Sequence, residues 1–332
     1  MQSMPRLFIA LSLVLSLPCL APSHLEAQRP ILSEVEVVES YDAAFGELPE
    51  GVAVHPKTGE IFVGIAPTGE IRRLDPKTYA GESLAFLDVG GGFLLGMAYA
   101  DAIYVAVASF DPSTCGIWRI GEDGSTARVV AFGGQEFPND LTFDKTGRLY
   151  ITESISGSVW VADPVTGGRE LWIQDVLLVG DPEQSPVPFP IGANGIAYDD
   201  ERDVLLVANS QVPAIVEIEN HFGTAGALTV LAAGEHLRGA DGIALDRQGD
   251  VLVVSNFNST VLHLDRASGA ATVLADGEDG LVFPATGAFG QFGNDKHSFF
   301  VTNFGFGASP DAPVGLLKVD VGVKSEKCPA GN

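Results

Sequence analysis

The chain has 332 residues, of which 46% are hydrophobic, and its 43 acidic residues outnumber 19 basic ones to give a formal net charge of −24 at pH 7. A charge this negative argues against nucleic acids and anionic membranes as partners, because both would be repelled. The length suits one large β domain or two ordinary domains.

The N-terminus has the pattern of a secretory signal peptide. Arg6 provides a short basic region, residues 7–17 form an apolar run too short for a bilayer span, and Ala27 is a small residue before a predicted cleavage point. Lipid attachment at Cys19 is the alternative, but residues 16–18 make a poor lipid-attachment box. We therefore expect a leader over residues 1–27 and a secreted or periplasmic mature domain over residues 28–332. No later apolar stretch is long enough to span a membrane.

One pattern recurs along the rest of the chain: a leading residue, glycine or a substitute, and then alternating apolar residues. The six copies begin at Glu50, Leu95, Asn139, Asn194, Asp241 and, in a degenerate form, Thr286. Successive starts are 45, 44, 55, 47 and 45 residues apart. The longest interval indicates an insertion, which we place in the irregular, Pro-rich stretch 177–191.

Each copy continues as a short all-β unit. Turns with glycine, such as residues 55–59 and 246–249, lead into strands that are almost wholly apolar, as strands buried on both faces should be. Third strands then end in acidic turns, such as residues 163–167. Three or four strands per unit without helical periodicity predict an all-β fold, a six-bladed β-propeller with four-stranded blades around a central channel. Residues 35–38 would supply the outer strand of the last blade and close the ring.

Blade geometry brings the leading residues together. If each first strand runs down the channel from one end, which we call the top face, all six leading residues meet there. Four of them are carboxylates or amides: Glu50, Asn139, Asn194 and Asp241. Burying such groups is costly without a partner, and no leading residue is Lys or Arg, so a metal is expected. Oxygen ligands favour a hard divalent cation such as Ca²⁺. The alternative is that these residues only hydrogen-bond their local backbone.

At these residues the chain resembles the senescence marker protein (regucalcin)/gluconolactonase family, with the paraoxonases and diisopropyl fluorophosphatase as more distant relatives. The matching pieces are residues 49–54, 138–140, 193–198 and 240–246, and the resemblance extends over roughly residues 35–321. It implies that the same four residues surround a catalytic divalent cation, usually calcium.

The chain also departs from that family's pattern. Phe137 stands where the sugar-lactone members place an arginine, which disfavours a polar sugar lactone. Gly51 follows Glu50, so the second, structural calcium site of the paraoxonases has no full match. Asp140 is expected to contact substrate or to steady Asn139, and a simple turn at the start of the strand is the alternative.

Aromatic side chains are expected around the ion. Several phenylalanines fall in loops of the top face, and with the insertion as a lid they would form an apolar mouth for substrate; they are Phe110, Phe137, Phe189, Phe257, Phe304 and Phe306. The alternative is that they pack between blades. His236 is the only histidine expected near this face, and we place it on the surface. Cys115 and Cys328 are expected on opposite faces, which disfavours a disulfide.

These features predict a metal-dependent hydrolase of a small-molecule lactone or ester. The cation would polarise the carbonyl, and Asp241 would act as general base or as nucleophile. A non-catalytic exported propeller that binds a ligand or protein on its top face is the alternative. An enzyme resembling strictosidine synthase would share the fold, but Glu50 and Asp241 count against it.

Overall fold

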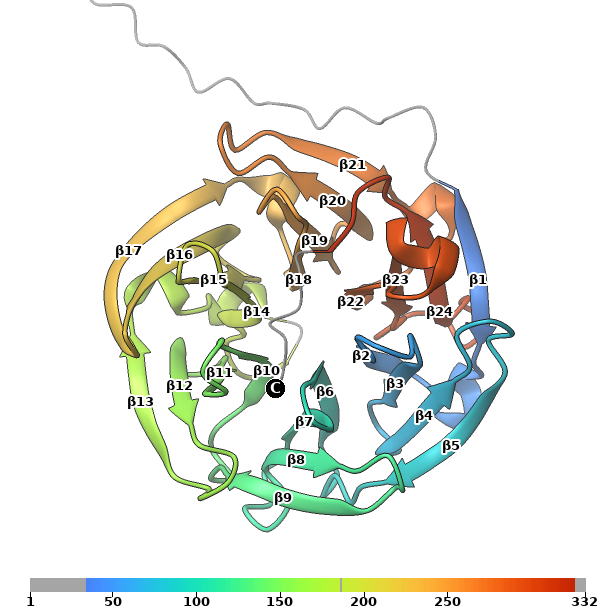
Figure 1. Cartoon of the computed structure of the whole chain (residues 1–332), viewed down its shortest axis with the longest axis horizontal. Coiled ribbons are helices and arrows are strands. Elements are labelled where there is room, and N and C mark those ends of the chain that lie inside the picture. Colours follow the sequence, from blue (N-terminus) through green and yellow to red (C-terminus); the bar gives the residue numbers. More distant parts are fainter. Residues whose placement is uncertain (1–33, 186, 326–332) are drawn as a thin grey trace, which may run out of the picture.

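The computed structural model describes residues 34–185 and 187–325, so the predicted leader and Cys328 lie outside the described residues. Six four-stranded antiparallel sheets surround a central channel (Figure 1), which confirms the predicted six-bladed β-propeller. From the axis outward the blades are β2 Pro49–Val54, β3 Ile61–Ile65, β4 Glu70–Leu74 and β5 Gly81–Phe86; β6 Phe93–Tyr99, β7 Ile103–Ala108, β8 Gly116–Ile120 and β9 Thr126–Ala131; and β10 Pro138–Phe143, β11 Leu149–Glu153, β12 Ser158–Ala162 and β13 Arg169–Gln174.

The second half of the ring repeats this arrangement. Its blades are β14 Ala193–Asp199, β15 Val204–Asn209, β16 Ala214–His221 and β17 Thr224–Ala233; β18 Ala240–Leu245, β19 Val251–Ser255, β20 Thr260–Leu264 and β21 Ala271–Ala275; and β22 Pro284–Phe289, β23 Ser298–Asn303, β24 Gly315–Asp320 and β1 Val35–Ser40. Helical structure in the described residues is limited to six short 3₁₀ turns: η1 Ala43–Phe45, η2 Val176–Leu178, η3 Pro182–Gln184, η4 Glu235–Leu237, η5 Gly277–Asp279 and η6 Gly293–His297. None of these turns could cross a bilayer.

The two ends of the chain close the ring within one blade. Strand β1 pairs antiparallel with β24, from Val35 opposite Val319 to Ser40 opposite Gly315. The prediction that residues 35–38 complete the last blade is therefore confirmed. This pairing covers the outer edge of β24 and gives the last blade four strands, like the other five.

The hydrophobic core lies between successive blades. One cluster joins Tyr104 and Ile117 of the second blade to Leu141 and Ile151 of the third. Every residue of the second strand β7 is buried, and the same is true of β15 and β19. These strands are covered on both faces by neighbouring blades, which explains why their sequences are apolar throughout and do not alternate.

Each innermost strand carries a β-bulge at its top end. In the fourth blade Ala193 pairs with Asn209 and Ile196 with Val207, so Asn194 and the following glycine oppose a single residue. All six inner strand pairs shift register at this same point. A bulge turns the extra side chain away from the sheet, and here it turns the leading residue toward the channel.

This register corrects one prediction. Pro284 pairs with Asn303 and Gly287 with Val301, so the bulge of the last blade holds Ala285 and Thr286. The sixth leading residue is therefore Ala285, and Thr286 takes the place of the glycine. The sequence pattern was aligned on Gly287, which is one position too late because the strand pairing sets the bulge.

Candidate active site

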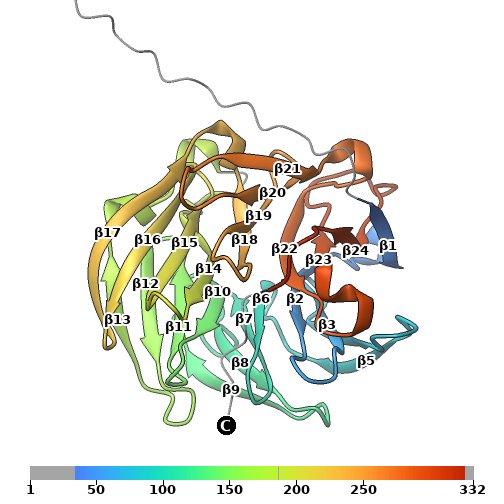
Figure 2. The same ribbon diagram turned by 45° about the horizontal axis from the view of Figure 1, so that its top comes forward.

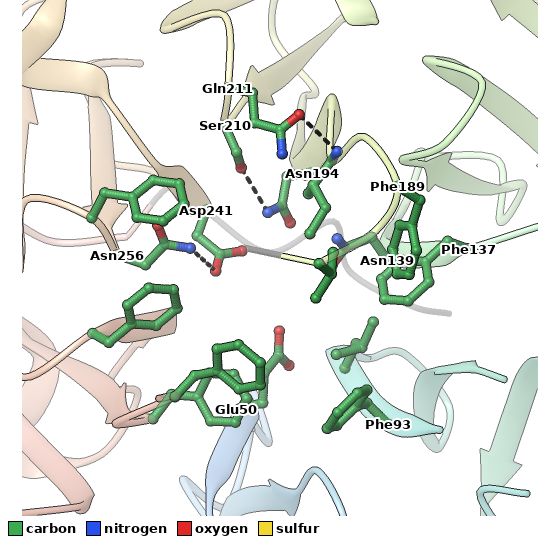
Figure 3. Close-up of a pocket in the computed structure, with 17 residues that line it drawn as sticks. Glu50, Phe93, Phe137, Asn139, Phe189, Asn194, Ser210, Gln211, Asp241 and Asn256 are labelled. Carbon is green, nitrogen blue, oxygen red and sulfur yellow. Dashed lines mark hydrogen bonds between the residues drawn. The ribbon is translucent and has the colours of Figure 1, made fainter. Parts of the chain in front are cut away.

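The predicted polar leading residues share one pocket at the top of the channel. Glu50, Asn139, Asn194 and Asp241 all line it, from four different innermost strands (Figure 3), and each is at most 7% exposed. The strands β2, β10, β14 and β18 carry them, and these are four of the six innermost strands of the ring (Figure 2). Residues up to 191 positions apart (50 to 241) therefore meet in one cavity.

The two asparagine amides are held in one orientation by matching hydrogen-bond relays. Asn139 Nδ2 donates to Ser154 Oγ at 2.9 Å, and Asn194 Nδ2 donates to Ser210 Oγ at 2.8 Å. Each serine then donates to a backbone carbonyl of the next blade at 2.7 Å. Because both amide nitrogens are hydrogen-bonded to serines of the pocket wall, the amide oxygens face the pocket. The Oδ1 atom of Asn194 is buried and has no hydrogen-bond partner.

The two carboxylates of the pocket are buried without a protein cation. Asp241 Oδ2 accepts a hydrogen bond from Asn256 Nδ2 at 3.1 Å, whereas Glu50 Oε2 has no hydrogen-bond partner. Burial, together with the negative charge of Asp140, raises the pKa of Asp241 to about 8, although the hydrogen bond from Asn256 opposes the rise. Burial raises the pKa of Glu50 well above its usual range, with the negative charges of Asp241 and Asp140 adding to the effect.

This donor set fits a hard cation. Glu50 Oε2, Asn194 Oδ1 and Asn256 Oδ1 are buried oxygen atoms without a partner, and all three residues line the pocket. No Lys or Arg is among the described residues that line it. Carboxylate and amide oxygens are the ligands that Ca²⁺ takes, and a cation would also offset the charge of the buried carboxylates.

The structure gives Asp140 a different place from the predicted substrate contact. It stands where other blades have the glycine of the bulge, and it lines the cavity at the opposite end of the channel. Its carboxylate accepts the backbone N–H groups of Leu141 at 2.8 Å and Ile196 at 3.0 Å. Burial raises the pKa of Asp140 to about 7. Asp140 therefore joins the third blade to the fourth beneath the pocket.

The bulge glycines allow neighbouring blades to approach closely. A Cβ atom on Gly195 would lie 2.0 Å from the backbone oxygen of Asp241, and one on Gly51 would lie 2.4 Å from that of Leu95. Neither distance is compatible with a real Cβ. Small residues at these positions therefore bring adjacent leading residues together.

The predicted apolar mouth is present. Five of the six predicted phenylalanines line the pocket: Phe137, Phe189, Phe257, Phe304 and Phe306. Phe110 is exposed and packs on Phe189 with ring centroids 5.7 Å apart. The insertion contributes Val187 and Ile191 beside Phe189, so its predicted position beside the site is confirmed.

The sequence interpretation missed several pocket residues that hold equivalent positions in different blades. Phe93 and Phe283 line the pocket two residues before a leading residue, as Phe137 does. Ser210 and Asn256 both directly follow a second strand, and the residue after Ser210, Gln211, also lines the pocket. Aligning the ends of the second strands, as well as the starts of the first strands, would have identified these positions.

A second group of possible metal ligands lies in the fifth blade, on the face opposite the pocket, and its members already pair with protein groups. Ligand atoms of Asp246, Asp250 and His263 lie within 4.8 Å of one another. Asp246 accepts two backbone N–H groups of its own turn through Oδ1 and pairs with His263 Nε2 at 3.0 Å through Oδ2. Arg202 pairs with Asp199 in the corresponding turn of the fourth blade. We interpret the Asp246–His263 pair as the same kind of structural ion pair.

No histidine is among the described residues that line the pocket, and His236 lies outside it in η4. The pocket therefore has no Ser–His–Asp arrangement in these residues. Cys115 is buried as a free thiol whose Sγ donates to a backbone carbonyl at 3.6 Å.

No protein-family model and no curated protein matches the sequence. Many solved structures are similar to it, and three of them illustrate the likeness. A luciferin-regenerating enzyme has a TM-score of 0.67 at 14% identity, covering 88% of this chain and 97% of that one. A regucalcin from Agrobacterium tumefaciens, described as calcium-binding, has 0.66 at 16%, covering 91% and 98%. A gluconolactonase from Xanthomonas campestris has 0.64 at 15%, covering 87% and 89%. The structural neighbours of this chain are thus gluconolactonase- and regucalcin-like six-bladed propellers.

Proposed function

We propose that this chain is a metal-dependent hydrolase of a lactone or ester, with Ca²⁺ as the cation favoured by the donor set. The observation that carries the proposal is a set of buried oxygen atoms without partners, gathered around two carboxylates at the floor of an apolar pocket. The lactonase class is supported by the gluconolactonase and regucalcin among the structural neighbours. The leader expected over residues 1–27 would direct this activity outside the cytoplasm.

Glu50, Asn139, Asn194 and Asp241 would hold the cation. When bound, it supplies a Lewis acid that polarises a carbonyl and neutralises a developing oxyanion. The serine relays keep both asparagine carbonyls turned toward the pocket, and the polar floor is preorganised in this way.

Asp241 is the candidate catalytic residue. Asn256 holds its Oδ2 atom, which leaves Oδ1 for the reaction. As general base, Asp241 would take a proton from the water that attacks the carbonyl carbon; the C–O bond of the lactone or ester then breaks, and the proton passes to the leaving alkoxide. As nucleophile, Asp241 would bond to the carbonyl carbon while the same C–O bond breaks and the leaving alkoxide takes a proton from water; a second water would then hydrolyse the acyl-enzyme. A single turnover in ¹⁸O water separates these routes, because label in the Asp241 carboxylate would exclude simple base catalysis.

Metal analysis and a substrate screen test the proposed function. Purified protein should contain or bind calcium, and it should hydrolyse members of a panel of lactones, aryl esters and phosphotriesters in a chelator-sensitive manner. Asp241→Asn should abolish turnover, whereas Asp320→Asn, an exposed aspartate at the end of β24, should not. Turnover that survives both chelator and Asp241→Asn would refute the mechanism, and bound metal without any turnover would favour a binding propeller.

A further inference from the structure

Two groups of phenylalanines form walls above the polar floor, and Phe93, which also lines the pocket, packs against both groups. Phe137 and Phe189, which belong to the third blade and the insertion, have ring centroids 5.1 Å apart (Figure 3). The other wall comes from the fifth and sixth blades. The ring centroids of neighbouring members lie 5.5 to 6.3 Å apart, and the four members are Phe257, Phe283, Phe304 and Phe306. All six line the pocket, so a ligand above the floor meets aromatic faces and edges on both sides.

Among the described side chains that line the pocket, Gln211 carries a buried nitrogen atom without a hydrogen-bond partner. Gln211 is 1% exposed, and its Oε1 accepts the backbone N–H of Ile191 at 2.9 Å. This bond fixes the amide, and its Nε2 is buried without a hydrogen-bond partner. Figure 3 shows the NH₂ group of Gln211 on the pocket side, above Asn194. In the next blade the same position is occupied by Phe257, so the donor is specific to this part of the rim.

Few other groups could bind a polar ligand. No Lys, Arg, His, Tyr or Trp is among the described residues that line the pocket. Ser210 Oγ already donates to a backbone carbonyl and accepts from Asn194. A substrate with several hydroxyl groups would lose its hydrogen bonds to water here and regain few of them.

We propose that the substrate is a lactone or ester with one apolar, ring-sized group and no sugar-like set of hydroxyls. The apolar group lies between the two phenylalanine walls, and Gln211 donates a hydrogen bond to an oxygen of the lactone or ester. The lactone or ester group in this inference rests on the proposed function, whereas the apolar group and the hydrogen bond from Gln211 are inferred from the pocket itself.

Binding of an unreactive analogue tests recognition separately from turnover. The probe is 5-phenylpyrrolidin-2-one, a lactam whose amide resists hydrolysis, compared with pyrrolidin-2-one by titration calorimetry on the calcium-loaded full chain. The phenyl group should strengthen binding at least tenfold. Phe189→Ala and Phe283→Ala should each remove most of that gain, whereas Phe222→Ala, a 98% exposed phenylalanine of the β16–β17 hairpin, should leave it unchanged.

Two variants, Gln211→Leu and Gln211→Glu, test whether lactam affinity depends on the N–H donor of this side chain or only on its shape. Both should weaken binding of both lactams about tenfold, the size of one lost hydrogen bond to a buried oxygen. Gln211→Glu retains an acceptor for the N–H of Ile191, so weakening in this variant cannot come from release of the loop. A thermal midpoint within a few degrees of wild type shows that each variant is folded. Wild-type affinity in both variants would overturn the assignment of Gln211.

Turnover of the matching lactones distinguishes the two proposals. The kcat/KM for γ-phenyl-γ-butyrolactone should exceed that for glucono-δ-lactone at least a hundredfold. Equal or reversed preference would overturn the recognition proposal and leave the hydrolase intact. Phenyl-dependent binding of the lactam without turnover of any lactone or ester would instead refute the hydrolase and leave the recognition proposal standing.

Discussion

Replacing Asp241 by asparagine should stabilise the metal-free protein, and by more at pH 8 than at pH 6. Burial raises the pKa of this carboxyl from 3.8 to about 8, so the folded state holds the proton more tightly than the unfolded chain does. The ionised group therefore costs stability increasingly as pH rises from 3.8 toward 8. At about 1.4 kcal/mol per pKa unit, the cost is about 3 kcal/mol at pH 6 and about 5 kcal/mol at pH 8.

The wild type and Asp241→Asn should thus differ by about 2 kcal/mol more at pH 8 than at pH 6. Asparagine retains an oxygen for the hydrogen bond from Asn256, so the substitution removes charge with little change in shape. Urea unfolding in chelator at pH 6, 7 and 8 measures the difference. Asp320→Asn makes the same charge change at an exposed site and serves as the matched control.

Without calcium, Asp241→Asn should be more stable than the wild type; with saturating calcium, the wild type should be the more stable of the two. The wild type should gain free energy of unfolding as calcium is added, because the ion binds only the folded state, whereas Asp241→Asn should gain much less. A difference between wild type and variant that stays flat from pH 6 to pH 8 in chelator would refute the reasoning. So would equal stabilisation of both by calcium.

Three further changes test other parts of the structure. Ser210→Ala should release the adjacent asparagine amide and weaken calcium binding about three- to tenfold by calorimetry; unchanged affinity would contradict the relay. Gly195→Ala should lower the free energy of unfolding by about 2 kcal/mol or more, since its Cβ would lie 2.0 Å from a backbone oxygen. Gly277→Ala, with open space around the added Cβ, should be nearly neutral in the same urea titration. Asp246 raises the pKa of His263, so the stabilisation is complete below the unfolded value of about 6.5 and is lost as pH rises through the folded pKa. His263→Gln should therefore destabilise the protein more at pH 5.5 than at pH 9, and a pH-independent loss would exclude the ion pair.

Much of the site could be predicted because it is repeated. Glu50, Asn139, Asn194 and Asp241 start equivalent strands, so finding the repeat was enough to place them at one pore. The prediction for the sixth copy was wrong for a local reason. Its glycine, at position 287, is not the glycine of the bulge, and only the pairing with β23 shows that Ala285 takes the leading position.

Repeat spacing and apolar patterning are properties of each unit alone, and they were sufficient for the blade number, the ring and five of the six leading residues. The orientation of the site's side chains, in contrast, depends on contacts between neighbouring blades. The amide of Asn194 is aligned by Ser210, 16 residues away, and that serine is held by the next blade. Asp140 serves the adjoining strand instead of the pocket, and Gln211 is turned by a backbone N–H of the insertion. Such contacts depend on how neighbouring blades pack, because a side chain's hydrogen bonds are fixed only when its partner's position is.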